Sequence, residues 1–376
     1  MSSRSELPDG RITGTPVRIV LVGAGAMGQA WARALHKHPR CRLAAIVDSD
    51  PRRARGLALR LRLPELPVSA TLESLPGPAA DACVNATPPQ VHRSVITEAL
   101  TSGLSVLTEK PFAMDLDQAA ELTGTAARHG RLLMVSQSRS LQPGADAFRT
   151  AVGRLGGLHR LEARFSRGYP AEGFRSELDQ PLLRDMAVHA FDTARMLTGS
   201  DADSVYCDAP ARPRSGYRGP AEAIALFTML DGSRFLYQGS WCAPAMPTAW
   251  SGRWRATGPH GTATWTGAGT VRLALVSGAG VSSREAGADH EPASDEDGRI
   301  VAQVDDQGFD RDPVRQVAAP LEEFLDALAT GAPGWGSARN NLATMAMLDA
   351  AIASARCGAP VAVVPGAARI PAGRGD

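Results

Sequence analysis

The sequence predicts two domains: an α/β domain with a doubly wound parallel sheet, then an α+β domain with an open, mainly antiparallel sheet. Up to about residue 137, continuous apolar runs alternate with stretches of helical length, which is typical of parallel strands buried on both faces. Beyond that point, strand-like runs follow one another through tight turns, which indicates antiparallel pairing. With 376 residues and 44% hydrophobic content, the chain can form two cores.

The first domain is expected at residues 17–137, after a flexible leader at residues 1–16. Its strands are predicted at VRIVLV, LAAIVD, DACVNA, SVLT and LLMVS, with helices in the segments between them. Because each run is short and apolar throughout, the strands should lie inside a sheet that helices cover on both faces.

The second domain is expected at residues 138–365, followed by a tail at 366–376. Its predicted elements are a helix near Gly144 to Leu155, a strand at LHRLEARFS, a helix at Leu182 to Leu197, and strands at AEAIALFTML, SRFLYQGSW, RWRATG, GTATWTG and TVRLALV. Residues 284–312 are acidic and poor in apolar groups, which predicts a mobile insertion. Helices at about Val314 to Thr330 and Ala338 to Cys357 should pack back onto the body.

Charge and cysteine content exclude several classes of function. A formal net charge of +1, with arginines dispersed among carboxylates, argues against binding to nucleic acid or to an anionic membrane surface. No run approaches the roughly 18 apolar residues of a membrane span. The five cysteines show no metal-ligand spacing, so we expect no metal site and reduced thiols in a cytoplasmic protein.

A glycine-rich turn separates the first predicted strand from the first predicted helix. Gly23, Gly25 and Gly28 have GxGxxG spacing. The first glycine permits a tight turn, the second lets backbone N–H groups approach a pyrophosphate, and the third allows close helix packing. Although the motif alone is a weak signal, its position between strand and helix predicts a Rossmann-type dinucleotide site that includes Ala26 and Met27.

Asp48 ends the second predicted strand, 20 residues beyond the last glycine of that turn. A carboxylate here can accept hydrogen bonds from the adenosine ribose and would repel a 2′-phosphate, which favours NAD over NADP. Arg52 and Arg53 keep NADP possible. They follow Asp50-Pro51, which resembles a helix N-cap, so a solvated helix face is the alternative interpretation.

Lysine is rare in this chain, since Lys37 and Lys110 are the only two among 40 lysines and arginines. TEKP follows the predicted strand SVLT, which places Lys110 at the carboxyl edge of the sheet, where open α/β folds bind ligands. An ammonium group there can bind a hydroxyl or carbonyl oxygen as a point charge. The alternative, a surface lysine paired with Glu109, explains neither the position nor the rarity.

The segment PLLRDMAVHAFDTARMLTG carries a polar stripe on an otherwise apolar helix. At about 100° per residue, Asp185, His189 and Asp192 lie within about 60° of one another. Such a stripe, if buried, must have partners or face a polar cavity. Two interpretations stay open: a structural network with Arg184 and Arg195, or the wall of an active site.

The motifs GAGAMG, NATPPQVH, VLTEKPFA, DMAVHAFD and SARCGAPVAV together resemble the glucose–fructose oxidoreductase/inositol dehydrogenase family, Gfo/Idh/MocA, from Val17 to about Pro365. The resemblance implies a Rossmann domain, a second domain with an open antiparallel sheet, a nicotinamide cofactor, and a homodimer or homotetramer formed through that sheet. This chain reads DQPLLRD where many members have a glycine-rich turn, which predicts a differently shaped substrate entrance.

The resemblance also implies roles for particular residues. Lys110 would position the substrate and assist proton movement, His189 would be the general acid/base, and Asp185 would orient a reacting polyol. The cofactor cleft would further include Ala86, Thr87, Pro88, His92 and Glu109. Apart from the resemblance, four residues are candidates for contacting the small-molecule substrate: Arg139, Tyr169, Asp192 and Trp241. For Arg139, Tyr169 and Trp241 the alternative is a role in packing or a place on the surface.

We therefore predict an NAD(P)-dependent dehydrogenase or reductase acting on a hydroxyl or keto group of a sugar, cyclitol or related polyol. A histidine of ordinary pKa, roughly 6.5, can take the hydroxyl proton near neutrality, and a lysine can stabilise an alkoxide-like oxygen. Two alternatives stay open. One is a redox-neutral epimerase, lyase or glycosidase acting through a transient ketone, and the other is a non-catalytic metabolite sensor.

Overall fold

The structure is a computed structural model, and it describes residues 15–75, 80–168, 170–212, 215–276, 299–303, 306–366 and 370. Tyr169, residues 284–298 of the predicted acidic insertion, and nearly all of the predicted leader and tail lie outside the described residues. Two compact units divide the chain. The first comprises the described parts of Met1–Ser138, Asp312–Met345 and Pro365–Asp376, and the second those of Arg139–Arg311 and Ala346–Val364.

The first unit contains a six-stranded sheet in the order β3-β2-β1-β4-β5-β6. Its strands are β1 (Val17–Val22), β2 (Cys41–Val47), β3 (Val68–Ser69), β4 (Ala82–Asn85), β5 (Ser105–Thr108) and β6 (Leu133–Val135), all paired in parallel. The predicted doubly wound sheet is confirmed, with one short strand, β3, added at its edge. In this strand order, ligands bind at the carboxyl ends of the strands.

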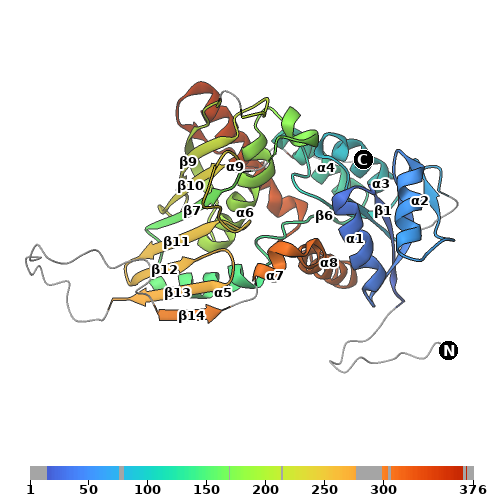
Figure 1. Ribbon diagram of the computed structural model, residues 1–376, viewed down its shortest axis with the longest axis horizontal. Helices are drawn as coiled ribbons and strands as arrows, with labels where there is room; N and C mark the ends of the chain where they lie inside the picture. Colours follow the sequence, from blue (N-terminus) through green and yellow to red (C-terminus); the bar gives the residue numbers. More distant parts are fainter. Residues whose placement is uncertain are drawn as a thin grey trace, which may run out of the picture. The chain divides into compact units, whose positions relative to one another are not determined.

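Helices cover this sheet because their apolar stripes match its buried strands. They are α1 (Ala26–Lys37), α2 (Pro51–Arg60), α3 (His92–Thr101), α4 (Leu116–Arg128), α8 (Pro313–Thr330) and the first part of α9 (Ala338–Cys357), with the short 3-10 helix η1 (Pro89–Val91) before α3. Helix α8 packs against α1, where Leu321 and Phe324 join Trp31 and Ile19 in one core (Figure 1). Residues 312–345 thus return to the first unit.

The second unit contains a nine-stranded sheet in the order β14-β13-β12-β11-β7-β10-β9-β8-β15. Its strands are β7 (Arg160–Ser166), β8 (Ala202–Asp208), β9 (Glu222–Met229), β10 (Arg234–Ser240), β11 (Arg253–Gly258), β12 (Gly261–Trp265), β13 (Thr270–Leu275), β14 (Arg299–Gln303) and β15 (Val361–Ala362). Only the β7–β10 pair is parallel, so the predicted mainly antiparallel sheet is confirmed. Strands β8, β14 and β15 were not predicted.

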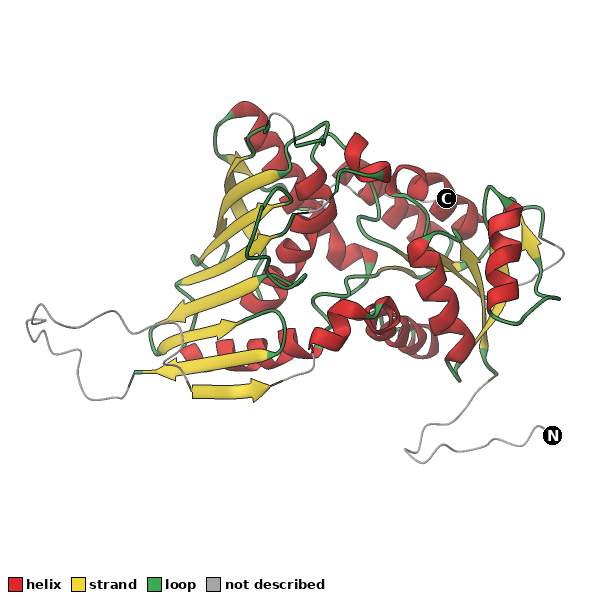
Figure 2. Ribbon diagram, viewed as in Figure 1, coloured by secondary structure: helices red, strands yellow, loops and turns green. Residues whose placement is uncertain are grey.

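The two faces of this second sheet differ in chemistry. On one face, Phe227, Phe235, Trp254 and Trp265 stack in a row, and Phe191 packs edge-on against the first of them. Helices α5 (Pro143–Val152) and α6 (Val188–Thr198) lie on this face, and the short helix α7 (Asp306–Arg311) follows β14 (Figure 2). The opposite face exposes the side chains that alternate with the buried ones.

The helix expected at Leu182 to Leu197 is present, but it is not regular. Leu183–Ala187 form a π-helical turn, η4, that leads into α6. This wider turn departs from the regular spacing of about 100° per residue on which the predicted stripe was based. Asp185 lies within the π-helical turn, whereas His189 and Asp192 lie on α6.

All five cysteines, Cys41, Cys83, Cys207, Cys242 and Cys357, are free thiols. Burial raises the pKa of Cys41 and of Cys207 to about 12, so both remain protonated near neutral pH. Among the described residues, no helix has the length and apolar character needed to cross a membrane.

Candidate active site

The glycine-rich turn between β1 and α1 leaves room for a phosphate. Gly23 has φ +99, and a Cβ on it would lie 2.8 Å from the carbonyl carbon of Ala86. A Cβ on Gly28 would lie 2.0 Å from the Gly23 oxygen, whereas one on Gly25 would meet nothing within 4 Å. The open space at Gly25 adjoins the N-terminus of α1, whose unpaired N–H groups and dipole favour an anion. This turn fits the pyrophosphate of a dinucleotide.

Asp48 lies beside this turn, at the end of β2. Its Oδ2 accepts the Ala24 N–H at 2.8 Å and its Oδ1 accepts the Asp50 N–H at 2.9 Å. A carboxylate has about four lone-pair positions, so two bonds leave capacity for ribose hydroxyls. Asp50 caps α2 as predicted and binds Arg52 at 3.0 Å, which holds the pKa of Asp50 below its ordinary value. Arg52 is otherwise exposed, as expected for a solvated helix face.

A polar network that the sequence did not reveal joins the ends of β4 and β5. Asn85 is buried, donates to the Thr108 hydroxyl at 3.0 Å, and accepts the Thr87 hydroxyl at 2.6 Å. The backbone carbonyl oxygen of Asn85 also accepts the Glu109 N–H at 2.9 Å. Pro88 follows as the residue before η1. This network holds together the loops that follow β4 and β5, both of which were predicted to line the cofactor cleft.

Lys110 lies two residues after the end of β5, at the edge that the sequence predicted, and its neighbours on both sides are anchored. Glu109 accepts the Trp31 indole N–H at 2.9 Å, and the carbonyl oxygen of Pro111 lies 2.9 Å from the Nδ1 atom of His92. Trp31 and His92 are both fully buried. Nothing in the sequence identified Trp31, because a tryptophan on the apolar stripe of a helix is typical of a core residue.

His92 was predicted to line the cofactor cleft, and in the structure both of its ring nitrogens lie near backbone carbonyl oxygens in the interior of the first unit. Its Nε2 atom lies 2.8 Å from the Thr87 carbonyl oxygen, and the Pro111 carbonyl is its other partner. Burial lowers the pKa of His92 to about 4; the two carbonyls oppose this shift, and the nearby Lys110 charge adds to it. The ring is therefore neutral near pH 7 and carries a single N–H.

The two carboxylates of the predicted stripe have separate partners in the second unit. Asp185 accepts a hydrogen bond from Arg175 at 2.7 Å, and Asp192 accepts one from the Ser140 hydroxyl. Arg175 and Ser140 were not expected from the sequence, since both are distant from the stripe along the chain. They come close only because the loop before η4 and the end of the β6 loop fold against this helix.

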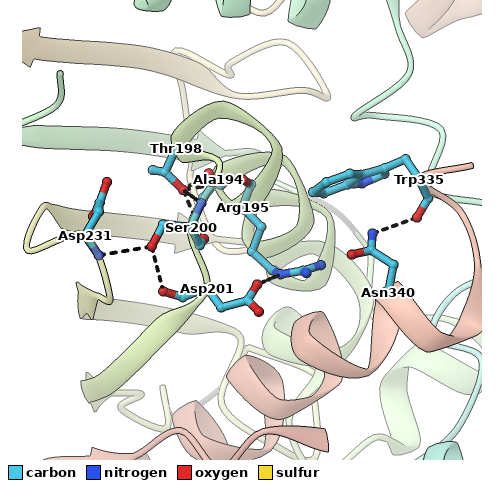
Figure 3. A network of polar contacts seen from close by, with 8 residues as sticks. All are labelled: Ala194, Arg195, Thr198, Ser200, Asp201, Asp231, Trp335 and Asn340. Atoms are coloured by element: carbon cyan, nitrogen blue, oxygen red, sulfur yellow. Dashed lines mark hydrogen bonds and ion pairs between the residues drawn. The ribbon is translucent and has the colours of Figure 1, made fainter. Parts of the chain in front are cut away.

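The arginines that we considered as partners for the stripe form other ion pairs. Arg184 binds Asp179 at 2.8 Å, and Arg195 binds Asp201 at 2.7 Å. Figure 3 shows the second pair at the C-terminal end of α6, near the Ser200 hydroxyl, which accepts the Asp231 N–H. These contacts stabilise the end of the helix and the following turn.

His189 is buried on α6 and lines a cavity of about 20 Å³ within the second unit. Other lining residues are Arg139, Thr193, Tyr237, Trp250 and Ser251. A cavity of about 10–15 Å³ can hold one water molecule, whereas pockets for small-molecule ligands have about 300–1,000 Å³. This cavity therefore has the size of a water site next to the imidazole.

Two predicted substrate residues are engaged in the interior of the second unit. Arg139 donates to Asp310 at 2.8 Å and to Ser251 at 3.2 Å. Trp241 is 2% exposed and packs edge-on against Phe165, with ring centroids 5.0 Å apart. Arg139 lines the His189 cavity, and Trp241 packs against Trp250, which also lines it.

Comparison with known proteins agrees with the two-domain organisation of the chain. Residues 17–137 match the oxidoreductase family with an NAD-binding Rossmann fold, and residues 149–264 match the GFO/IDH/MocA C-terminal domain. The protein y4oX of Sinorhizobium fredii is 25% identical over 367 residues, which cover 92% of this chain and 95% of that protein. The myo-inositol dehydrogenase Hyg17 of Streptomyces leeuwenhoekii is 30% identical over 217 residues, covering 57% and 66%.

The fold also matches solved structures. An oxidoreductase from Agrobacterium radiobacter, in complex with NAD+, L-tartaric acid and magnesium, aligns with a TM-score of 0.79 and 19% identity, covering 93% of this chain and 99% of that one. The fold and the glycine turn thus define an NAD-binding oxidoreductase. The chain belongs to the GFO/IDH/MocA family, as its sequence motifs indicated.

Proposed function

We propose that this protein is an NAD-dependent dehydrogenase or reductase that interconverts a secondary hydroxyl and a ketone on a sugar, cyclitol or related polyol. The observation that carries the proposal is the position of Lys110, which follows β5 at the carboxyl edge of the sheet that also carries the glycine turn and Asp48. Similarity to a myo-inositol dehydrogenase supports the class of substrate.

In the proposed chemistry, one residue transfers the proton and another stabilises the negative charge that develops on the substrate oxygen. Oxidation of a secondary alcohol removes a proton from oxygen and a hydride from carbon. When bound, the nicotinamide ring supplies the hydride acceptor. His189 takes the hydroxyl proton, and Lys110 stabilises the alkoxide-like oxygen as negative charge develops. Asp185, held by Arg175, orients the polyol, and in the reverse direction His189 returns the proton.

A spectrophotometric assay of cofactor reduction tests this function directly. Purified protein is incubated with NAD, and separately with NADP, against a panel of sugars, sugar nucleotides and cyclitols, and formation of the reduced cofactor is followed by absorbance. We expect turnover with at least one polyol and a preference for NAD, because Asp48 would repel a 2′-phosphate. Tight NAD binding with substrate conversion but no net reduction would instead support a redox-neutral reaction. Cofactor binding with no conversion would support a sensor.

The open face of the second sheet supports assembly into a homodimer or homotetramer. Tyr206, Ile224 and Leu226 are 47%, 50% and 45% exposed on adjacent strands β8 and β9. Neighbouring exposed apolar side chains of this size are typical of a protein interface. We propose that a second copy of the chain covers them.

Light scattering tests the proposed assembly. The wild type should have the mass of a dimer or tetramer, and Leu226→Arg should lower the mass towards that of a monomer, because it places a charge in an apolar contact. Leu59→Arg is a matched control, since Leu59 is 56% exposed on α2 of the first unit. A monomeric wild type, or an equal effect of both variants, would refute this interface.

A further inference from the structure

We propose that His92 is a positioning residue that holds the Lys110 loop in place through the carbonyl group of Pro111. The proposal rests on the function assigned to Lys110 above. His92 begins α3, and its ring reaches the loop after β5, with Nδ1 2.9 Å from the Pro111 oxygen. Both ring nitrogens lie near backbone carbonyl oxygens, so the proposed effect of the ring on the reaction is indirect.

The backbone around Lys110 explains why this contact matters. On the preceding side, Glu109 is held by the Asn85 carbonyl and by the indole of Trp31, both at 2.9 Å. On the following side, Pro111 has no N–H, so its carbonyl is the backbone group through which it can be anchored. Lys110 therefore lies between two fixed residues, and a shift of about 1 Å in such a group can cost about 100-fold in rate.

The proton on His92 can be assigned from its two partners. Both are carbonyl oxygens, which only accept hydrogen bonds, and the neutral ring has one N–H. Pro111 is buried, whereas Thr87 is partly exposed. Because a buried carbonyl without a donor costs more than one near solvent, we place the N–H on Nδ1, towards Pro111.

Three substitutions separate the two contacts of the ring. The amide nitrogen of asparagine can occupy the place of Nδ1, so His92→Asn can keep the bond to Pro111. The amide nitrogen of the longer glutamine can reach the place of Nε2, so His92→Gln directs its N–H groups to the Thr87 carbonyl instead of the Pro111 carbonyl. His92→Leu removes the single N–H while filling a similar volume. Each variant is first checked by circular dichroism and thermal unfolding, so that only folded protein is compared.

We expect the asparagine and glutamine variants to differ in kcat. His92→Leu and His92→Gln should lower kcat at saturating NAD by about tenfold or more, and His92→Asn should stay within about threefold of the wild type. Hydrogen exchange at the backbone amides of Glu109, Lys110 and Phe112 should follow the same order, with faster exchange in the leucine and glutamine variants. The affinity of the variants for NAD, measured by fluorescence titration, should not follow this order.

The other outcomes overturn the proposal. Equal loss in all three variants would mean that the ring only fills space, and rescue by glutamine instead of asparagine would assign its role to Thr87. Unchanged kcat in the leucine variant would remove any role in positioning. The exchange data keep this test distinct from a test of Lys110 itself, because they report on the loop even if Lys110→Ala retains turnover.

Discussion

Replacing Lys110 with alanine should lower kcat by about 100-fold or more, while the protein folds normally and binds NAD with an affinity within about threefold of the wild type. The loss follows from removing a positive charge at the oxygen that becomes alkoxide-like in the transition state. The glycine turn and Asp48, which hold the cofactor in our proposal, are unaffected by the change. Steady-state kinetics and fluorescence titration with NAD measure the two effects separately.

Lys37→Ala is the matched control, because Lys37 is the one other lysine of the chain and lies exposed at the end of α1. Its kcat should equal that of the wild type. Lys110→Arg adds a stricter comparison, since it retains the charge but presents a planar fork in place of a compact ammonium group. Wild-type turnover in Lys110→Ala would rule out the proposed role of this residue.

Replacing His189 with alanine should lower kcat/KM by about 100- to 10,000-fold, the range expected when a general base is removed. In addition, we expect the acidic limb of the wild-type pH profile, which the proposed proton transfer to His189 would produce, to be absent from the residual activity. That change in the pH profile is specific to a group that transfers the proton, because a merely structural side chain would lower the rate equally at every pH.

His159→Ala is the control in the same unit, since His159 is exposed next to β7 and outside the cavity that His189 lines. It should leave the profile unchanged. If His189→Ala keeps the acidic limb of the profile, another group must accept the proton. The buried position of His189 makes thermal unfolding a necessary check, because an alanine here enlarges a cavity.

The sequence was most informative where local backbone requirements restrict the residue type. Gly23 needs a positive φ, and Gly28 needs the absence of a side chain, so the turn could be identified from the glycine spacing together with its position between a strand and a helix. Lys110 could be placed at the sheet edge because a short apolar run ends immediately before it. Asp50 and Pro51 marked the start of α2 for the same local reason.

Prediction was poorer where a residue's role depends on distant neighbours. The residues Asp185, His189 and Asp192 were predicted to share one stripe of a regular helix. The structure adds a π-helical turn at Asp185 and the partners Arg175 and Ser140, which the sequence did not indicate. Strand β8 was missed because its sequence, ADSVYCD, contains aspartate and alanine, which are uncommon in strands, and because its register depends on pairing with β9.

The sequence by itself determined the fold class, the glycine turn, the acidic residue after β2 and the lysine after β5, because each depends on short-range backbone geometry or on hydrophobic periodicity. Only the tertiary structure decided that Trp31 and His92 anchor the two sides of the Lys110 loop. These contacts join residues 78 and 19 positions apart along the chain. Their geometry arises from the packing of α1 and α3 against the sheet, which no local pattern specifies.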